Sequence, residues 1–198
     1  NLYEAKVSDF VAGRTAHFEL EEEDGLWEPY ADIQAAVDTI GGASAAEYVG
    51  TLGEVFDLER LLRLWAIELV TTNEDGYVMN ANNYLAYHGQ ERWTLVPWGS
   101  DQGFRWYRDI TDLSPIRGEL TARCEGVPEC HGRLETAILD LVADWEQGDF
   151  AAMVSAEAAV IQGDCEADPR APLPCDTASM LQFVKDRPAT IRQELGAP

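Results

Sequence analysis

Carboxylate and amide side chains gather in one stretch of the sequence, between Asn73 and Asp101. Asn73 and Asp75 come first, and Asp101 ends the stretch in a turn that contains two glycines; between them stand Asn80, Asn82 and Asn83. A loop aspartate can accept a proton from a hydroxyl group, and carboxylate and amide oxygens are ligands that Mg²⁺ takes in proteins. Phosphoryl transfer needs these two functions, because its nucleophile must be oriented and its charge neutralised.

Spacing alone leaves a second interpretation open for these residues. In protein kinases a loop aspartate is followed by a metal-binding asparagine and, further on, by a metal-binding aspartate, and the order here is the same. Asp and Asn are also favoured in turns, because their side chains hydrogen-bond to nearby backbone groups. A purely structural loop would therefore contain the same residue types.

Other candidate sites carry weaker signals. Ser100 lies between glycines, but the spacing is not that of a nucleophile elbow and no histidine is placed to assist it. The three histidines, His17, His88 and His131, are scattered, and structural roles are expected for them. The acidic run Glu21–Asp24 lacks the ligand spacing of a calcium loop and is expected to be a solvated turn, with weak calcium binding as the alternative.

The elements on either side of the polar stretch are well marked. Residues 57–70 carry apolar side chains at helical spacing and on other sides as well, which predicts a buried central helix. Asp57 is placed to cap its N-terminus. Residues 83–88 and 93–96 predict two strands joined through Gly89 as a hairpin, so the site would lie beside a hairpin.

The rest of the chain is mainly helical. A short strand is predicted at 16–20, and helices at 33–40 (ended by Gly41 and Gly42), 45–52, 134–145, 150–161 and 178–195, with a kink or restart at Pro188. The predicted fold class is therefore α+β and mainly helical, with one domain spanning residues 1–198.

The charge balance restricts the partners. The chain has 36 acidic and 14 basic residues, a formal net charge of −22. Such a field repels nucleic-acid phosphates and anionic membranes, so neither is expected as the main partner. No apolar run is long enough to cross a bilayer, and no transmembrane segment is expected.

The four cysteines form two close pairs in loop-like sequence. We expect two local disulfides, Cys124–Cys130 and Cys165–Cys175. Disulfides imply an oxidising compartment, so we expect an extracytoplasmic protein that is secreted or attached to the cell surface. Zinc is the competing interpretation, but no C-x-x-C occurs and only His131 lies next to a cysteine.

The order of motifs resembles the CotH family of atypical protein kinases of the spore coat. The resemblance is specific in three segments: Asn73-Glu74-Asp75, Asn82-Asn83-Tyr84-Leu85-Ala86-Tyr87, and Trp93-Thr94-Leu95-Val96-Pro97-Trp98-Gly99-Ser100-Asp101. Softer matches extend to Asn1-Leu2-Tyr3-Glu4 and to the final helix with Arg187. The resemblance implies a kinase-like fold that uses ATP with Mg²⁺ or Mn²⁺ to phosphorylate protein serines.

The resemblance also implies roles for particular residues. Asp75 takes the position of the catalytic base. Asn82 and Asn83 are the candidates for binding the cofactor, and Asn82 and Asp101 are the candidate metal ligands.

Two departures from the family pattern bear on activity. The family has two acidic residues after Pro-Trp, and here the first is Gly99, so one metal ligand or supporting carboxylate is absent. A kinase also needs a β-rich lobe with a phosphate-binding lysine, whereas this chain has only Lys6 and Lys185, neither in such a strand. We expect that lobe to precede Asn1, which makes residues 1–198 the C-terminal lobe.

Two functional hypotheses follow. The first is a secreted CotH-like kinase that transfers phosphate from ATP to Ser or Thr of a protein substrate or surface protein, with the C-terminal lobe inactive when isolated. The second is a non-catalytic kinase-like module for assembly of a coat or cell surface and for partner binding, which the loss of an acid at Gly99 favours.

Overall fold

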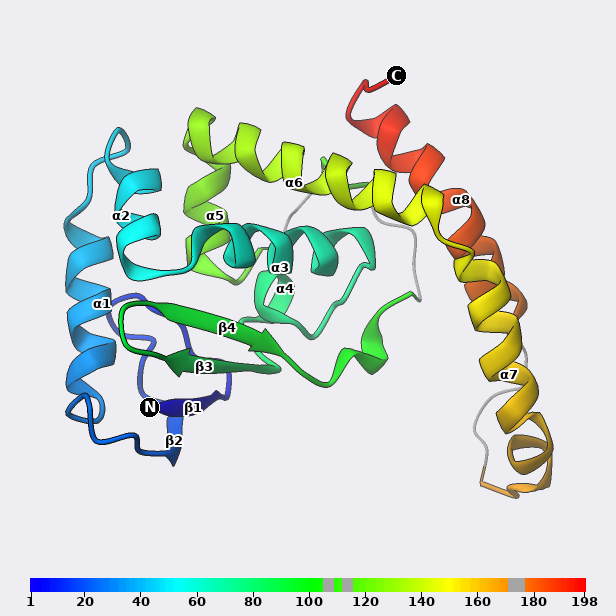
Figure 1. The fold of residues 1–198 in the computed structure, drawn as a ribbon, viewed down its shortest axis with the longest axis horizontal. Helices are drawn as coiled ribbons and strands as arrows, with labels where there is room; N and C mark the ends of the chain where they lie inside the picture. Colours follow the sequence, from blue (N-terminus) through cyan, green and yellow to red (C-terminus); the bar gives the residue numbers. More distant parts are fainter. Residues whose placement is uncertain (105–108, 112–115, 171–176) are drawn as a thin grey trace.

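A computed structural model of the chain describes residues 1–104, 109–111, 116–170 and 177–198. Within these ranges, α-helices pack against one antiparallel sheet, which confirms the α+β, mainly helical class (Figure 1). The strands are β1 (Leu2–Ala5), β2 (Phe18–Glu22), β3 (Tyr84–His88) and β4 (Trp93–Pro97). The helices are α1 (Ala31–Gly42), α2 (Tyr48–Val55), α3 (Leu58–Val70), α4 (Tyr77–Asn80), α5 (Glu119–Glu125), α6 (Pro128–Gln147), α7 (Phe150–Ala167) and α8 (Ala178–Glu194), with a 3₁₀ turn at Ser100–Gln102.

The sheet has the order β2-β1-β3-β4, with every neighbouring pair antiparallel. β3 and β4 form the predicted hairpin, in which Tyr84 pairs with Pro97 and His88 with Trp93. Alternate side chains face opposite sides, so Tyr84 and Trp93 are buried while Tyr87 is exposed. The sheet therefore has one face on the core and one open face.

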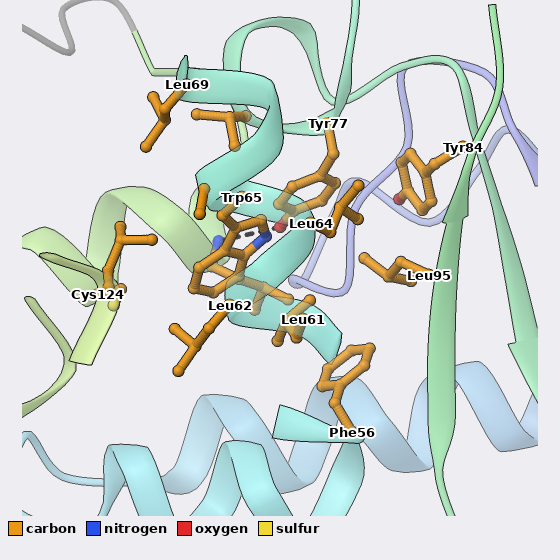
Figure 2. Close-up of a cluster of buried hydrophobic side chains, with 14 of the residues drawn as sticks. Phe56, Leu61, Leu62, Leu64, Trp65, Leu69, Tyr77, Tyr84, Leu95 and Cys124 are labelled. Carbon is orange, nitrogen blue, oxygen red and sulfur yellow. Dashed lines mark hydrogen bonds between the residues drawn. The ribbon is translucent and has the colours of Figure 1, made fainter. Parts of the chain in front are cut away.

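Helix α3 occupies the centre of the molecule. Figure 2 shows its Trp65 and neighbouring leucines between Tyr84 and Leu95 of the hairpin and Cys124 of α5. Asp57 caps the helix as predicted, because its side chain accepts a hydrogen bond from the backbone N–H of Arg60 at 3.2 Å. The end of this central helix leads directly into the polar stretch.

Helix α6 crosses beside α3, and α7 and α8 form an antiparallel pair at the far end (Figure 1). α8 continues through Pro188 rather than restarting there. A proline leaves the carbonyl four residues earlier without its helical donor. Here that carbonyl belongs to Val184, and it accepts a hydrogen bond from Trp145 Nε1 of α6 at 3.2 Å. No helix in the described part of the chain combines the length and apolarity needed to cross a bilayer.

One of the two predicted disulfides lies within the described ranges. Cys124 of α5 and Cys130 of α6 are bonded, with their Cα atoms 5.1 Å apart. Their thiols are therefore used by each other and not by zinc. The second predicted pair, Cys165–Cys175, includes Cys175, which lies outside the described residues.

Several element boundaries differ from those predicted. The first helix was expected to end before Gly41 and Gly42, but it includes both in its last turn and has its C-cap at Ala43. The strand predicted at 16–20 runs from Phe18 to Glu22, so part of the acidic run is strand and not turn. The helix predicted at 134–145 begins at Pro128, since proline suits a first helical turn. β1, α4 and α5 were not predicted.

Candidate functional site

The polar stretch that begins at Asn73 follows the C-terminus of α3, and the last turn of this helix is held in place by Arg187. Arg187 of α8 is buried, with its Nε 3.0 Å from the carbonyl oxygen of Val70 and its Nη2 3.2 Å from that of Leu69. A cation at the C-terminus of a helix satisfies carbonyls that lack helical partners and interacts favourably with the helix dipole. The last turn of α3 is thereby held by α8.

A buried carboxylate holds the far side of the same loop. Glu68 of α3 accepts hydrogen bonds from the backbone N–H groups of Tyr77, at 3.0 Å, and Val78, at 2.7 Å, which open α4. Burial raises the pKa of the Glu68 carboxyl to about 7, against the effect of the two backbone donors. Glu68 therefore joins the central helix to the segment that follows Asp75.

The hydroxyl of Tyr77 ties α4 to the beginning of the chain. It donates to Asp9 Oδ1 at 2.8 Å, while Asp9 Oδ2 accepts from the backbone N–H of Glu119 at 2.7 Å. Burial raises the pKa of Asp9 and raises that of Tyr77 well above its usual value. The short helix α4 is thus held by Glu68 at its backbone N–H groups and by Asp9 at the hydroxyl of Tyr77, its first residue.

Asp75 is surrounded by asparagine amides. Its Oδ1 accepts from Nδ2 of Asn80 at 2.6 Å and of Asn82 at 3.2 Å, and its Oδ2 accepts from Nδ2 of Asn83 at 2.9 Å. The structure therefore brings together Asp75, Asn82 and Asn83, three of the residues that the sequence singled out. Asn80 joins them as a fourth member.

The carboxylate fixes the orientation of each amide, because it accepts hydrogen bonds only and so must face the amide nitrogens. The amide oxygens then point elsewhere. Oδ1 of Asn80 accepts from Arg117 Nη1 at 3.0 Å, and Oδ1 of Asn83 accepts from Asn82 Nδ2 at 3.2 Å. Within the described residues, Oδ1 of Asn82 accepts no hydrogen bond, which leaves it as a free oxygen ligand beside Asp75.

The segment after the hairpin is attached at one end to Asn83 of this cluster and at the other to the end of α3. The N–H of Trp98 donates to the carbonyl of Asn83 at 3.0 Å, and the N–H of Phe104 donates to the carbonyl of Thr71 at 2.7 Å. Asp101 lies between these ties, on the turn Ser100–Gln102, and is exposed. Its carboxylate makes no hydrogen bond or ion pair with the described members of the cluster.

Gly99 occupies a restricted position in this segment. Its φ is +62°, and a Cβ at this position would lie 3.2 Å from Asn83 Nδ2 and 3.3 Å from Asn83 Cγ. Such contacts are tight, and side chains rarely adopt this backbone conformation. An acidic side chain at position 99 would therefore press on Asn83 in this conformation of the loop.

Left-handed backbone conformations are concentrated around the site. Thr72, Ala81, Asn83 and Phe104 have φ between 51° and 61°. Each such non-glycine conformation costs on the order of 1 kcal/mol, and it persists where the surroundings over-determine it. The hydrogen bonds to Asp75, Glu68 and Thr71 supply that constraint.

The remaining candidates from the sequence lie elsewhere. His88 is stacked between Trp27 and Trp93, with ring centroids 4.4 and 4.3 Å away, and its Nδ1 lies 3.1 Å from Asp32 Oδ2. Burial lowers the pKa of this histidine. The arrangement agrees with the structural role expected for it.

The acidic run contributes to a surface cluster. Carboxylate oxygens of Glu4, Glu19 and Glu21 lie within 4.8 Å of one another. Lys6 Nζ lies 2.7 Å from Glu19 and 3.3 Å from Glu4, and these contacts raise its pKa. Lys6 thus neutralises part of this cluster. Among the described residues, it makes no contact with the Asp75 loop.

Sequence reasoning assigned no role to Glu68 or Arg117, and noted Arg187 only as a family feature. Glu68 carried a recognisable signal, since it is an acid on a helix that is apolar on most sides, where a charge has to find a buried partner. Arg117 had no such signal, because its contact with Asn80 depends on how distant segments pack.

The comparisons with known proteins were made against families, curated proteins and solved structures. The family model described as "CotH kinase protein" matches residues 6–134, which contain the whole of the Asp75 cluster and Asp101. Neither the search of curated proteins nor that of solved structures found a match.

Proposed function

The chain belongs to the CotH kinase protein family, and on that premise we propose that it is the C-terminal lobe of an extracytoplasmic protein kinase that transfers phosphate from ATP to serine or threonine. The observation that carries this proposal is the carboxylate of Asp75, held by three asparagine amides inside the family-matched region. The disulfide Cys124–Cys130 supports the extracytoplasmic location, because structural disulfides persist in oxidising compartments.

Asp75 is suited to act as the base. An ionised carboxyl offers about four lone-pair directions. Three hydrogen bonds from asparagine amides occupy Asp75, which leaves one direction for a substrate hydroxyl. The same amides hold the carboxylate in one orientation, so that little reorganisation is needed when the hydroxyl arrives.

The reaction would proceed as follows. The serine or threonine oxygen of the substrate forms a bond to the γ-phosphorus of ATP, and the bond from that phosphorus to the β,γ-bridging oxygen breaks. ADP leaves with the electron pair of the broken bond, and the hydroxyl proton passes to Asp75.

Asn82, beside Asp75, and Asp101, on the segment after the hairpin, carry oxygen donors of the type that a hard divalent cation such as Mg²⁺ or Mn²⁺ binds. Asn82 offers a free amide oxygen and Asp101 an exposed carboxylate, both of the oxygen type that these ions prefer. We propose that these two residues hold the metal and that Asn83 supports the cofactor side of the site by fixing Asn82. The bound metal would supply neutralisation of the phosphate charge.

Arg117 adds a positive charge to this acidic chain at the same place. Its guanidinium contacts Asn80, whose amide contacts Asp75. Arg117 is exposed, so phosphate oxygens can reach it. Local positive charge favours binding of an anionic nucleotide where the net charge of −22 opposes it.

A second lobe is also part of the proposal. The open face of the sheet carries large exposed side chains, with Tyr87 47%, Val96 42% and Trp98 45% accessible. Trp98 lies directly before Gly99 at the edge of the site. We propose that a nucleotide-covering lobe, which would contain a strand with a phosphate-binding lysine, packs on this face.

A non-catalytic module for surface or coat assembly is the second candidate. Gly99 favours it, because the backbone at this position is left-handed and closely approached by Asn83, and so does not readily accept the family's acidic side chain. A degenerate site of this kind would bind a partner without transferring phosphate.

The test is phosphate transfer from labelled ATP by the full-length protein, with Mg²⁺ or Mn²⁺. Asp75→Ala and Asp101→Ala are each expected to reduce transfer by a factor of about 10² or more, since each removes a group needed at the reacting centre. Asp140→Ala is the matched control: it removes an exposed aspartate from α6 and is expected to leave transfer unchanged.

The outcomes separate the two functions. Transfer that is lost in both site variants and kept in the control supports the kinase. Absence of transfer with either metal, together with no thermal shift on adding ATP, would contradict the kinase and support the non-catalytic module.

A further inference from the structure

Glu68 is a charged group in an unusual place. The residue is only 2% exposed, on the side of α3 that faces α4. Burying a carboxylate is costly unless it is paired or hydrogen-bonded. No basic side chain forms an ion pair with Glu68 in the described ranges, and its two oxygens are instead satisfied by the N–H groups of Tyr77 and Val78. Both carboxylate oxygens of Glu68 thus accept hydrogen bonds from the segment that follows Asp75.

The carboxylate also packs directly on Gly76. A Cβ at position 76 would lie 2.5 Å from Glu68 Cδ and Oε1 and 2.7 Å from Oε2, closer than real Cβ atoms approach. Only a glycine fits beneath the carboxylate. The peptide between Asp75 and Gly76 is therefore held between α3 and α4.

The same peptide segment orders the asparagines. The carbonyl oxygen of Gly76 accepts hydrogen bonds from the N–H of Asn80 at 3.0 Å and of Asn82 at 3.4 Å. On the other side of Asp75, the N–H of Asn73 donates to the main-chain carbonyl of Glu68 at 2.8 Å. Asp75 thus lies between two backbone attachments to Glu68, and the amides that surround it are attached to Gly76.

We propose that Glu68 is a positioning residue for the phosphoryl-transfer site, which fixes Asp75 and its asparagines through Gly76 without touching the substrate. This inference rests on the proposed kinase function. It assigns a role to a residue outside the motifs that carry the family resemblance.

The experiment compares Glu68→Gln with the unaltered full-length protein. Glutamine has nearly the same shape, but its NH₂ group cannot accept from a backbone N–H, so one of the two attachments is lost. A displacement of about 1 Å at a reacting group can cost a factor of about 10². We expect kcat for phosphate transfer to fall by about 10- to 100-fold, with KM for ATP changed by less than about twofold.

Asp32→Asn is the matched control, since it also neutralises a buried carboxylate. Asp32 accepts from Tyr3 and Asn1 and contacts His88, at the opposite end of the hairpin from the Asp75 loop. We expect it to lower stability while kcat stays unchanged. An equal loss of kcat in both variants would mean that Glu68 acts only through general stability, and would overturn the proposal.

A second readout does not depend on activity. Amide hydrogen exchange of Tyr77 and Val78 is expected to accelerate in Glu68→Gln and not in Asp32→Asn, because local opening removes protection. Should Glu68→Gln not fold, the amide proton shifts of Tyr77 and Val78 in the unaltered protein, followed with pH, are expected to titrate together with the Glu68 carboxyl carbon.

The two failures are distinguishable. Unaltered kcat in a folded Glu68→Gln variant, unchanged exchange at Tyr77 and Val78, or amide shifts that do not follow the Glu68 carboxyl would each overturn the positioning role. Absence of transfer from the unaltered protein would overturn the kinase function itself, and the exchange measurement would still decide whether Glu68 holds the loop.

Discussion

Gly99 shows how a single residue restricts the chemistry of the site. Its position between Trp98 and Ser100 places it against the side chain of Asn83, which in turn holds Asp75. A side chain here would press on Asn83 and adopt an unfavourable backbone conformation. The packing of Asn83 and the absence of an acidic residue at position 99 are thus two aspects of one local arrangement.

Gly99→Ala is expected to destabilise the protein by about 1 kcal/mol, because alanine is strained at positive φ and its Cβ presses on Asn83. Urea unfolding followed by circular dichroism measures the change. Gly132→Ala is the matched control, since Gly132 lies inside α6 with nothing within 4 Å of an added Cβ. That change is expected to stabilise by up to about 1 kcal/mol. Two changes of the same sign would contradict this account of Gly99.

The sequence predicted a functional cluster of carboxylate and amide residues around Asp75, but not the residues that hold this loop in place. Carboxylates and amides in a loop between a buried helix and a hairpin gave a weak signal, and the resemblance to the CotH family singled out Asp75, Asn82 and Asn83 among them. Glu68 and Arg187 were not assigned roles because they bind backbone groups, whose positions depend on tertiary packing. The role of Asp101 as a metal ligand stays a prediction.

At the scale of elements, the site depends on two buried charges at the junction of α3 and α4. Arg187 holds the carbonyls that end α3, and Glu68 holds the N–H groups that begin α4. Each charge compensates a helix terminus that lacks its own partners. The turn that carries Asp75 lies between these two fixed ends.

Glu68 gives the protein a measurable pH dependence of stability. Its pKa is raised to about 7 in the folded state from 4.5, so the folded state binds more protons between these values. Stability from this group is therefore full below about pH 4.5 and is lost as pH rises through 7. The free energy of unfolding of the unaltered protein, minus that of Glu68→Gln, is expected to fall by on the order of 3 kcal/mol between about pH 4.5 and 8.

The difference in unfolding free energy between the unaltered protein and Glu68→Gln separates the titration of Glu68 from that of neighbouring groups. Charged or titratable groups near it are Asp75, Tyr77, Tyr84 and Arg187, with Asp9 linked through Tyr77. Burial also raises the pKa of Asp9, which acts in the same direction but is common to both proteins. Urea unfolding at a series of pH values makes the measurement, and a difference that is constant or rises with pH would contradict the assignment.

Most of the secondary structure followed from periodicity. The central helix with its cap and the C-terminal helices were predicted from apolar residues at helical spacing, and the hairpin from two short strand patterns on either side of Gly89. The four-residue elements β1 and α4 were too short to show a period, and β1 becomes a strand only because β2 and β3 flank it. Pro188 was expected to disturb α8, but Trp145 of α6 satisfies the carbonyl that the proline leaves free.

At the scale of the whole molecule, the described part of the chain covers one face of the sheet and leaves the other exposed. α3 covers the inner face, and the outer face presents Tyr87, Val96 and Trp98 to solvent. Exposed apolar patches beside a site commonly mark an interaction surface. The proposed second lobe would cover this face and complete the nucleotide site.

The full-length protein offers an internal test of that arrangement. Tyr87 and Tyr30 are 47% and 50% exposed, and Trp98 and Trp27 are 45% and 38% exposed, but only Tyr87 and Trp98 lie on the open face of the sheet or at its edge. Hydroxyl-radical labelling with mass spectrometry is expected to oxidise Tyr87 and Trp98 more slowly than Tyr30 and Trp27. Equal rates within each pair would mean that no lobe covers the face.

The strand order β2-β1-β3-β4 has a consequence for how the molecule assembles. β1 pairs with β2 nearby in sequence and β3 with β4, whereas the pairing of Leu2 with Tyr87 joins distant parts of the chain. Closing a long loop costs entropy before its contacts compensate, and such pairings slow folding. On a ribosome the central strand pair cannot form until residue 88 has emerged, after the Asp75 loop has already been made. The end of α3 waits longer still, because Arg187, which holds the carbonyls of Leu69 and Val70, is made more than 100 residues later.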